Sequence, residues 1–226
     1  MQKFMTELTL IIPAKNESES LPRVLKEIQD LDVKIKVLLH KEDTLTINSI
    51  KKFNCEIIHQ VNRGFGDALI HGINSTDTRY FCIFNADGSF NPLELKNMLN
   101  KINELNYDFI FASRYQKNSG SEDDTIITLV GNFIFFKIGK IFFNLPITDI
   151  LYTFVLGKTA SAKKLNLIQK DFSFCIELPI KAIRQSMTML STSSYERKRL
   201  AGIKKVNAFK DGFLILKHMI YLFFKK

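Results

Sequence analysis

The sequence predicts an α/β protein with a mainly parallel sheet flanked by helices. Short apolar runs alternate with longer segments of helical spacing over the first half of the chain, as in strand–helix–strand units. The 226 residues are 46% hydrophobic and 24% charged, which is enough apolar mass for one large core and excludes a disordered or fibrous protein. We therefore expect a single domain over residues 1–226.

Five strands are predicted in the first half, because each segment is a short, mostly apolar run of strand length. They are Leu8–Ile12, which Pro13 ends, then Lys34–Leu39, Glu56–His59, Arg79–Phe84 and Asp108–Ala112. Helices are predicted between them from helical spacing and from start signals. They are Ser18–Asp30, Thr46–Phe53, Gly66–Asn74 and a helix that Asn91 caps, Pro92 opens and Asn106 ends.

The pattern changes beyond Gly120. A long, Phe-rich segment, Ile126–Phe143, carries Lys137 and Lys140, and a second apolar segment with lysines closes the chain. The remaining predicted elements are a return to the sheet over Ile147–Leu156, a helix over Phe174–Gln185 despite Pro179, an extended segment over Met187–Tyr195, a basic loop over Glu196–Lys205 and an amphipathic helix over Asp211–Phe224.

The net charge of +9 favours an anionic partner, such as a nucleotide or an acidic membrane. Nucleic acid is not expected, because no recognition motif is present. Cys55, Cys82 and Cys175 have neither zinc nor disulfide spacing, so we expect buried free thiols and a reducing cytoplasm. No signal peptide is recognised near the start, and no segment reaches the roughly 20 uncharged apolar residues of a spanning helix.

Four polar clusters follow predicted strands: Ala14–Glu17, His40–Asp43, Asn85–Ser89 and Ser113–Arg114. Ligands of parallel α/β sheets bind at the carboxyl ends of the strands. Because all four clusters fall at that edge, the sequence predicts one polar site there.

Three motifs suggest what this site could bind. Oxygen ligands in Asn85–Ser89 could hold a divalent metal bridging a diphosphate, although Asp87 is the only carboxylate of that loop. In Pro13–Glu17, Lys15 could meet a phosphate and Glu17 a ribose or a base. The two glycines of Asn62–Asp67 would allow close backbone approach and anion binding at a helix start.

Taken in order, PAKNE, NRGFGDALIHGI, NADGSFNP, ASRY, TD and the late basic loop resemble glycosyltransferase family 2, which has the GT-A fold. Within that family, the polyprenyl-phosphate (dolichol-phosphate) mannosyl- and glucosyltransferase branch is the most similar. The resemblance spans roughly residues 7–217. It implies an enzyme that transfers a sugar from a nucleotide-sugar by displacement at the anomeric carbon.

The resemblance also implies roles for individual residues. The residues expected to bind the nucleotide-sugar are Pro13, Ala14, Lys15, Asn16, Glu17, Arg63, Gly64, Asp67, Asn85 and Ala86. Those expected to hold Mg²⁺ or Mn²⁺ are Asn85, Asp87 and Ser89. Those expected at the phosphates or the acceptor are Arg114, Arg199 and Lys205. Asp87, Arg114 and Asp149 are the expected catalytic residues, with Asp149, in the Thr148–Asp149 pair, as base or acceptor-positioning residue.

Four departures from the family pattern bear on these roles. His40 and Lys41 stand where a pair of aspartates usually contacts the nucleotide, so the choice of base is open. Phe65 replaces a lysine between the two glycines, and Asn85 replaces the first aspartate of the D-x-D motif. The Gly-Phe-Arg that often follows the Thr-Asp pair is replaced around 153–155.

The acceptor is expected to be a polyprenyl phosphate at the inner face of the cell membrane. Residues 126–145 and 211–226 could form interfacial helices, with apolar faces among acyl chains and lysines at head groups. Packing on the core or in a homo-oligomer interface is the alternative for these segments. A glycan hydroxyl in surface polysaccharide or lipopolysaccharide synthesis is the alternative acceptor. A catalytically inactive nucleotide-sugar binding module is the non-enzymatic alternative, motivated by Asn85 and Phe65.

Overall fold

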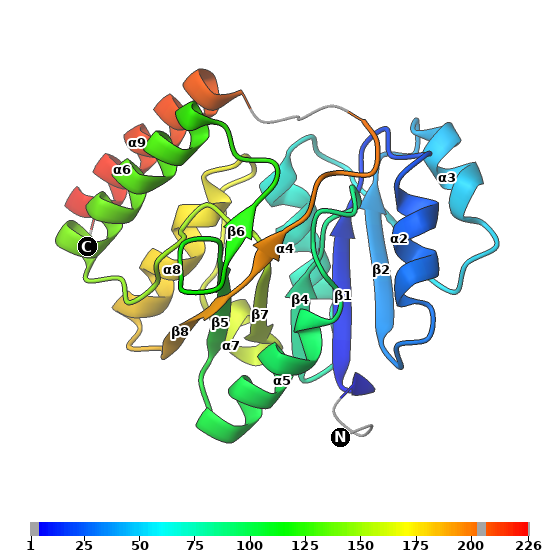
Figure 1. Cartoon of the computed structure of the whole chain (residues 1–226), viewed down its shortest axis with the longest axis horizontal. Helices are drawn as coiled ribbons and strands as arrows, with labels where there is room; N and C mark the ends of the chain where they lie inside the picture. Colours follow the sequence, from blue (N-terminus) through cyan, green and yellow to red (C-terminus); the bar gives the residue numbers. More distant parts are fainter. Residues whose placement is uncertain (1–4, 203–206, 226) are drawn as a thin grey trace.

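The computed structural model describes residues 5–202 and 207–225 and has a seven-stranded sheet at its centre (Figure 1). Its strands lie in the order β3-β2-β1-β4-β7-β5-β8. Their bounds are β1 Leu8–Pro13, β2 Lys34–Leu39, β3 Glu56–His59, β4 Tyr80–Ile83, β5 Phe109–Ser113, β7 Val155–Lys158 and β8 Met189–Ser193. All neighbours pair in parallel except β7, which runs antiparallel to both β4 and β5. The predicted α/β class with a mainly parallel sheet is therefore confirmed.

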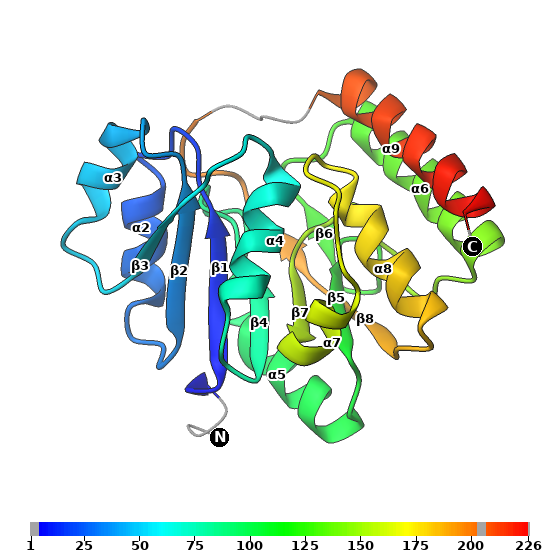
Figure 2. The same cartoon turned by 180° about the vertical axis from the view of Figure 1, so that it is seen from behind.

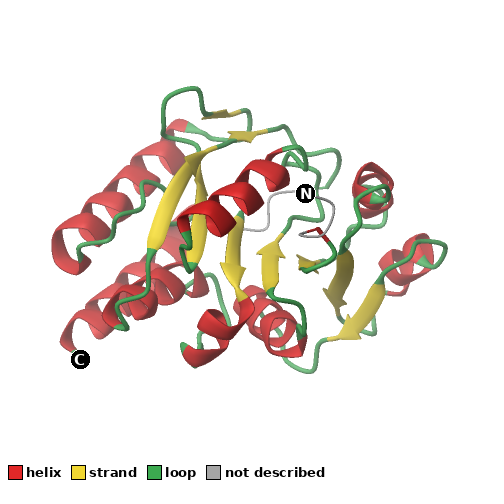
Figure 3. Ribbon diagram, turned by 90° about the horizontal axis from the view of Figure 1, so that it is seen from below, coloured by secondary structure: helices red, strands yellow, loops and turns green. Residues whose placement is uncertain are grey.

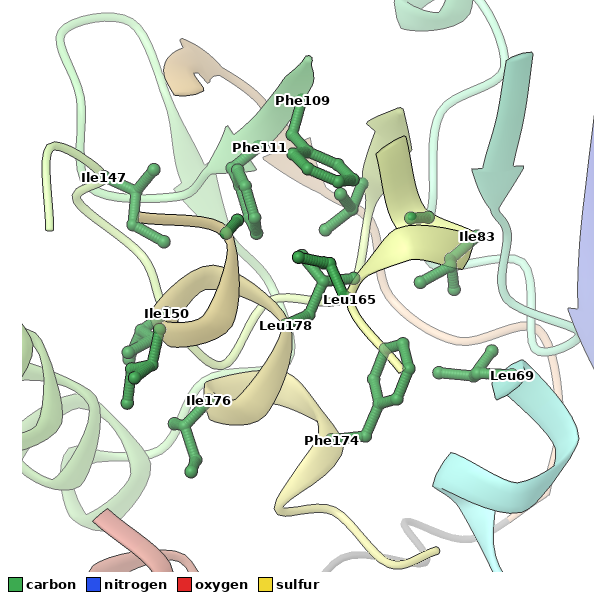
Figure 4. Close-up of a cluster of buried hydrophobic side chains, with 14 of the residues drawn as sticks. Leu69, Ile83, Phe109, Phe111, Ile147, Ile150, Leu165, Phe174, Ile176 and Leu178 are labelled. Carbon is green, nitrogen blue, oxygen red and sulfur yellow. The ribbon is translucent and has the colours of Figure 1, made fainter. Parts of the chain in front are cut away.

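Helices cover both faces of the sheet, as Figures 2 and 3 show. Their bounds are α2 Leu21–Ile28, α3 Thr44–Ile50, α4 Phe65–Ser75, α5 Glu94–Leu105, α6 Ile126–Phe143, α7 Thr159–Lys164, α8 Phe174–Arg184 and α9 Ala208–Phe224. Residues of α2, α3 and α5 enter one core cluster. Residues of α4, α6, α7, α8 and α9 enter the other cluster, part of which is shown in Figure 4.

The two core clusters follow from alternation along the strands. In β1, Leu8, Leu10 and Ile12 point to the cluster of α2 and α5, whereas Ile11 points to the cluster of α4. Successive side chains of a strand face opposite sides of the sheet, so a strand covered on both faces must be apolar throughout. This is why β1 reads as an unbroken apolar run.

Several helix ends follow from local chemistry. The Thr125 hydroxyl accepts a hydrogen bond from the backbone N–H of Thr128 at 3.2 Å and caps the start of α6. Asn144, with φ of 55°, ends the same helix. Asn106 has the same φ and ends α5, as the sequence predicts.

The structure corrects the prediction at four places. The predicted return to the sheet over Ile147–Leu156 is mostly irregular, and β7 begins only at Val155. Helix α5 begins at Glu94, because Asn91 caps a turn by accepting from the N–H of Leu93. Helix α7 and a two-stranded parallel sheet were not predicted: its strands, β6 Gly120–Ser121 and β9 Tyr195–Glu196, are too short to show a period. Cys55, Cys82 and Cys175 are free cysteines, as predicted, but only Cys82 and Cys175 are buried, whereas Cys55 is partly exposed.

Candidate functional site

The polar clusters that follow β1 and β2 contact each other at the carboxyl edge of the sheet. The backbone N–H of Asn16 donates to Asp43 Oδ2 at 2.7 Å, and that of Glu17 donates to Thr46 Oγ1 at 3.0 Å. Glu17 is buried, and its Oε2 accepts from the Ser20 hydroxyl at 2.5 Å. The first cluster is therefore held in place by α3, which leaves the Lys15 side chain exposed.

The Asn85–Ser89 loop brings its three polar side chains together after β4. Asp87 Oδ1 accepts from the Ser89 N–H at 3.0 Å, and Asn85 Nδ2 donates to Ser89 Oγ at 3.2 Å. Gly88 has φ of 82°, and a Cβ there would lie 2.5 Å from Leu200 Cγ. The turn thus requires glycine both for its conformation and for the approach of Leu200.

A segment from near the end of the chain, Arg197–Gly202, lies across this loop. The N–H of Arg197 donates to the Ser89 carbonyl and that of Leu200 to the Asp87 carbonyl, both at 2.8 Å. At its far end, a Cβ on Gly202 would lie 3.7 Å from Glu17 Oε2. We call these residues the covering segment. It joins the loop after β4 to the cluster after β1.

Arg199 of the covering segment lies among carboxylates. Its Nη2 is 3.1 Å from Asp123 Oδ2 and 3.7 Å from Asp87 Oδ2, and its side chain is 19% exposed. Although partial burial acts to lower it, the pKa of Arg199 is raised above its usual value, because Asp123, Asp87 and Glu17 stabilise the charged form. Lys205, the other predicted cation of this loop, lies outside the described residues.

Arg114 and Asp149 form a buried ion pair beside this group. Arg114 Nε lies 2.8 Å from Asp149 Oδ2, and Nη2 lies 3.1 Å from Asp149 Oδ1. Its Nη1 also donates to Glu196 Oε2 at 3.1 Å and to Asp124 Oδ1 at 3.3 Å. The Arg114 guanidinium lies over the Tyr152 ring, with its Cζ 4.6 Å from the ring centroid.

This arrangement bears on the predicted catalytic roles. Both carboxylate oxygens of Asp149 accept from Arg114, and Asp149 is only 1% exposed. Burial raises the pKa of Glu196, while Arg114 acts in the opposite direction. The contacts of Asp149 are those of a residue that orients Arg114, so its predicted role as a base stays a prediction.

The two charged groups adjoin, because Asp123 binds Arg199 and the next residue, Asp124, binds Arg114. Sequence reasoning did not select Asp123, Asp124 or Glu196. The one feature of the sequence that could have indicated Asp123 and Asp124 is the acidic run Glu122–Asp124, which stands out in a chain of net charge +9. Their partners are distant in sequence, so the pairing could not be read from local spacing.

The two glycines at the start of α4, the N-cap Gly64 and the helical Gly66, lie against another part of the chain. A Cβ on Gly64 would lie 2.0 Å from the carbonyl oxygen of Lys170, and a Cβ on Gly66 would lie 2.1 Å from that of Gln169. The N–H of Asp67 donates to the Lys170 carbonyl at 3.1 Å. The start of α4 is therefore packed against the chain's own backbone, and the predicted binding of a ligand or anion at this helix start stays a prediction.

We predict that Gly66→Ala lowers the free energy of unfolding by about 1–3 kcal/mol, because the new methyl group must displace backbone. Gly131→Ala is the matched control, since a Cβ there meets nothing within 4 Å. In the interior of α6, that control should be neutral or stabilise by up to about 1 kcal/mol. Urea unfolding of both variants measures the difference, and equal stabilities would contradict the close approach.

The donor atoms at this edge do not make a preformed metal centre. Within residues 5–202 and 207–225, no group of three or more His, Cys, Asp or Glu side chains could hold a metal ion. The sequence of 203–206 contains none of these residue types. Asp87 accepts the Ser89 N–H and lies beside the Arg199 guanidinium, and the Asn85 amide bonds the Ser89 hydroxyl, so the predicted ligands come together but offer one carboxylate.

Comparison with known proteins identifies the family. The model of "Glycosyl transferase family 2" matches residues 9–165, more than half of the chain. The uncharacterized protein MJ1222 of Methanocaldococcus jannaschii is 25% identical over 132 residues, which are 56% of this chain and 54% of that protein. The chain thus spans about half the length of this curated relative.

Solved structures share the fold at low sequence identity. Glucosyl-3-phosphoglycerate synthase from Mycobacterium tuberculosis, in complex with Mn²⁺, UDP and glucosyl-3-phosphoglycerate, has a TM-score of 0.71 and 11% identity, covering 97% of this chain and 82% of that one. Mannosyl-3-phosphoglycerate synthase from Rubrobacter xylanophilus has a TM-score of 0.74 and 12% identity, covering 97% and 75%. The family resemblance in the sequence is thereby confirmed: the chain belongs to glycosyl transferase family 2, the glycosyltransferases, and has the GT-A fold.

Proposed function

We propose that the chain transfers a sugar from a nucleotide-sugar to a polyprenyl phosphate at the inner, cytoplasmic face of the cell membrane. The observation that carries the donor half is the meeting of Glu17, Asp87 and Arg199 at one edge of the sheet. A diphosphate needs positive charge beside it, and Arg199 and Lys15 supply charge at this edge.

The donor site is covered in the present conformation. Leu200 packs on Gly88, and the covering segment bonds the Asp87 and Ser89 carbonyls. Donor entry therefore requires the Leu200 side chain to move away from the loop. Such loop closure over a substrate excludes water from the reacting centre.

The acceptor half rests on the apolar surface of α6 and α9, which lie side by side (Figure 1). We call it the α6–α9 face. Its exposed side chains include Phe133, Ile134, Ile141, Phe142, Phe209, Phe213, Phe223 and Phe224. Phe142 and Phe223 touch edge to face, with centroids 5.6 Å apart, so the two helices present one continuous surface. An apolar patch of this extent is typical of a surface with a partner.

Charge selects the partner that we propose, an anionic bilayer. Helix α6 carries Lys137 and Lys140 and no acidic residue, and α9 carries Lys210 and Lys217 against Asp211. Each lysine near an anionic leaflet contributes about 1 kcal/mol. A second copy of the chain would instead bring lysines against lysines.

Within the part of the chain that the structure describes, helix α6 is the one helix long and apolar enough to be a candidate membrane span: its 18 residues have a mean hydropathy of 1.8, and 17% of them are buried. This finding qualifies the expectation from the sequence that no segment is long and apolar enough to span a membrane. Its inner side belongs to the domain, because Phe135 and Phe143 enter the core and a Cβ on Gly139 would lie 3.1 Å from Leu145. These contacts support an interfacial position rather than a spanning one.

The test of the proposed function is a transfer assay. UDP-, GDP- and CDP-sugars are each offered with a short polyprenyl phosphate in anionic liposomes or with a soluble glycan. Transfer to the lipid phosphate is the expected result. Transfer to the glycan alone would contradict the proposed acceptor, and donor binding without any transfer would identify an inactive binding module.

A further inference from the structure

We propose that Arg199, and not a divalent cation held by the Asn85–Ser89 loop, supplies the positive charge at the donor's diphosphate, so that donor binding needs no metal. This inference rests on the proposed donor site. It departs from the metal that the family resemblance implies, and from the Mn²⁺ in the structure of the glucosyl-3-phosphoglycerate synthase.

The loop offers one carboxylate, Asp87, where the D-x-D motif of the family offers two. Asn85 is a neutral amide, and its Nδ2 donates to Ser89 Oγ at 3.2 Å. Of the two Asp87 oxygens, Oδ1 already accepts the Ser89 N–H at 3.0 Å. Divalent Mg²⁺ and Mn²⁺ are bound chiefly by carboxylates, so this loop is a weak site without added charge.

A cation already lies at the remaining oxygen. Asp87 Oδ2 is 3.7 Å from Arg199 Nη2, and Asp123 holds the same guanidinium through Nε at 3.4 Å and Nη2 at 3.1 Å. A divalent ion at Asp87 would repel this guanidinium at short range. Arginine keeps its charge at every working pH, so the repulsion cannot be relieved by deprotonation.

The position of Arg199 is set by the backbone. The hydrogen bonds of Arg197 and Leu200 to the Ser89 and Asp87 carbonyls flank it on both sides. A guanidinium carries five N–H donors, more than Asp123 accepts, and binds phosphate oxygens in a planar fork. Arg199 is thus placed to bridge the acidic residues of the site and an incoming diphosphate.

The experiment is calorimetric titration of the full 226-residue chain with UDP, GDP and CDP, once in the presence of EDTA and once in the presence of Mn²⁺. We expect the preferred nucleotide to bind with the same affinity in both, within about twofold. Arg199→Gln should weaken binding by about 10- to 100-fold, the effect of losing a charge-assisted phosphate contact. Lys198→Gln is the matched control: this exposed lysine is the neighbouring cation of the same segment, and its loss should change affinity by less than about threefold.

A reciprocal variant tests the loop itself. Asn85→Asp restores a second carboxylate, and we expect Mn²⁺ to strengthen nucleotide binding in this variant but not in the parent chain. Binding by the parent chain that EDTA abolishes and Mn²⁺ restores would overturn the inference while leaving the donor proposal intact. Binding that Arg199→Gln leaves unchanged would also overturn it. No binding of any nucleotide, with or without metal, would overturn the donor proposal itself and this inference with it.

Discussion

Replacing Arg114 by methionine is expected to lower the free energy of unfolding by about 3–5 kcal/mol, the usual effect of breaking a buried ion pair. The guanidinium is the shared partner of Asp124, Asp149 and Glu196, and methionine would leave these carboxylates facing one another without a cation. Urea unfolding at neutral pH measures the loss.

Arg197→Met is the control for this substitution. Arg197 pairs with Glu27 at 2.6 Å, but both side chains are about one-third exposed, so its loss should change stability by up to about 1 kcal/mol. Equal free energies of unfolding for the two variants would contradict a larger contribution of the buried ion pairs to stability.

The Arg114→Met variant should also respond to pH. Burial raises the pKa of Glu196 and the Arg114 guanidinium opposes that rise, so removing the guanidinium raises the Glu196 pKa further, and the folded variant binds more protons there than its unfolded chain. Stability then increases as the pH falls through that window, and the deficit relative to the parent chain shrinks on acidification. A deficit that stays constant between pH 7 and pH 5 would show that its cause is steric and not electrostatic.

The double variant Phe133→Glu, Phe213→Glu is expected to weaken binding to anionic liposomes by at least about 100-fold. Both rings are more than half exposed on the α6–α9 face, so their apolar area would be buried only against a partner. Co-sedimentation with vesicles of anionic and of neutral lipid measures the change. The melting temperature should stay close to that of the parent chain.

The matched control is Leu45→Glu, Leu93→Glu. Both leucines are highly exposed, and they lie on or beside α3 and α5, away from the α6–α9 face. These substitutions add the same charge, so they should leave liposome binding within about threefold of the parent. Vesicle binding that survives Phe133→Glu, Phe213→Glu, together with dimers that this variant dissociates, would assign the face to a second copy.

Local pattern was sufficient for most of the fold. Strands β2 and β3 have the predicted bounds, and α6 begins at the predicted residue and ends two residues before the predicted end at 145, because these limits are set by changes in apolar composition. The segment 147–154 was misassigned as strand, since buried residues such as Ile147, Ile150 and Tyr152 look alike in a strand and in a packed irregular segment.

The candidate site was predictable only in part. The rule that polar turns gather at the carboxyl edge placed Glu17 and Asp87 correctly. It could not place Asp123 beside Arg199, a contact between residues 76 positions apart. Nor could the sequence show that Gly64 and Gly66 lie against the backbone carbonyl groups of Lys170 and Gln169.

The pairing of α6 with α9 has a consequence for synthesis of the chain. The Phe143 and Phe223 rings touch, with centroids 6.2 Å apart, yet they are 80 positions apart in sequence. Domains acquire structure from the amino end as the ribosome releases them. The part of α6 that packs on α9 therefore stays uncovered until α9 emerges, and a nascent chain stalled before Ala208 should be a target for chaperones that bind aromatic segments.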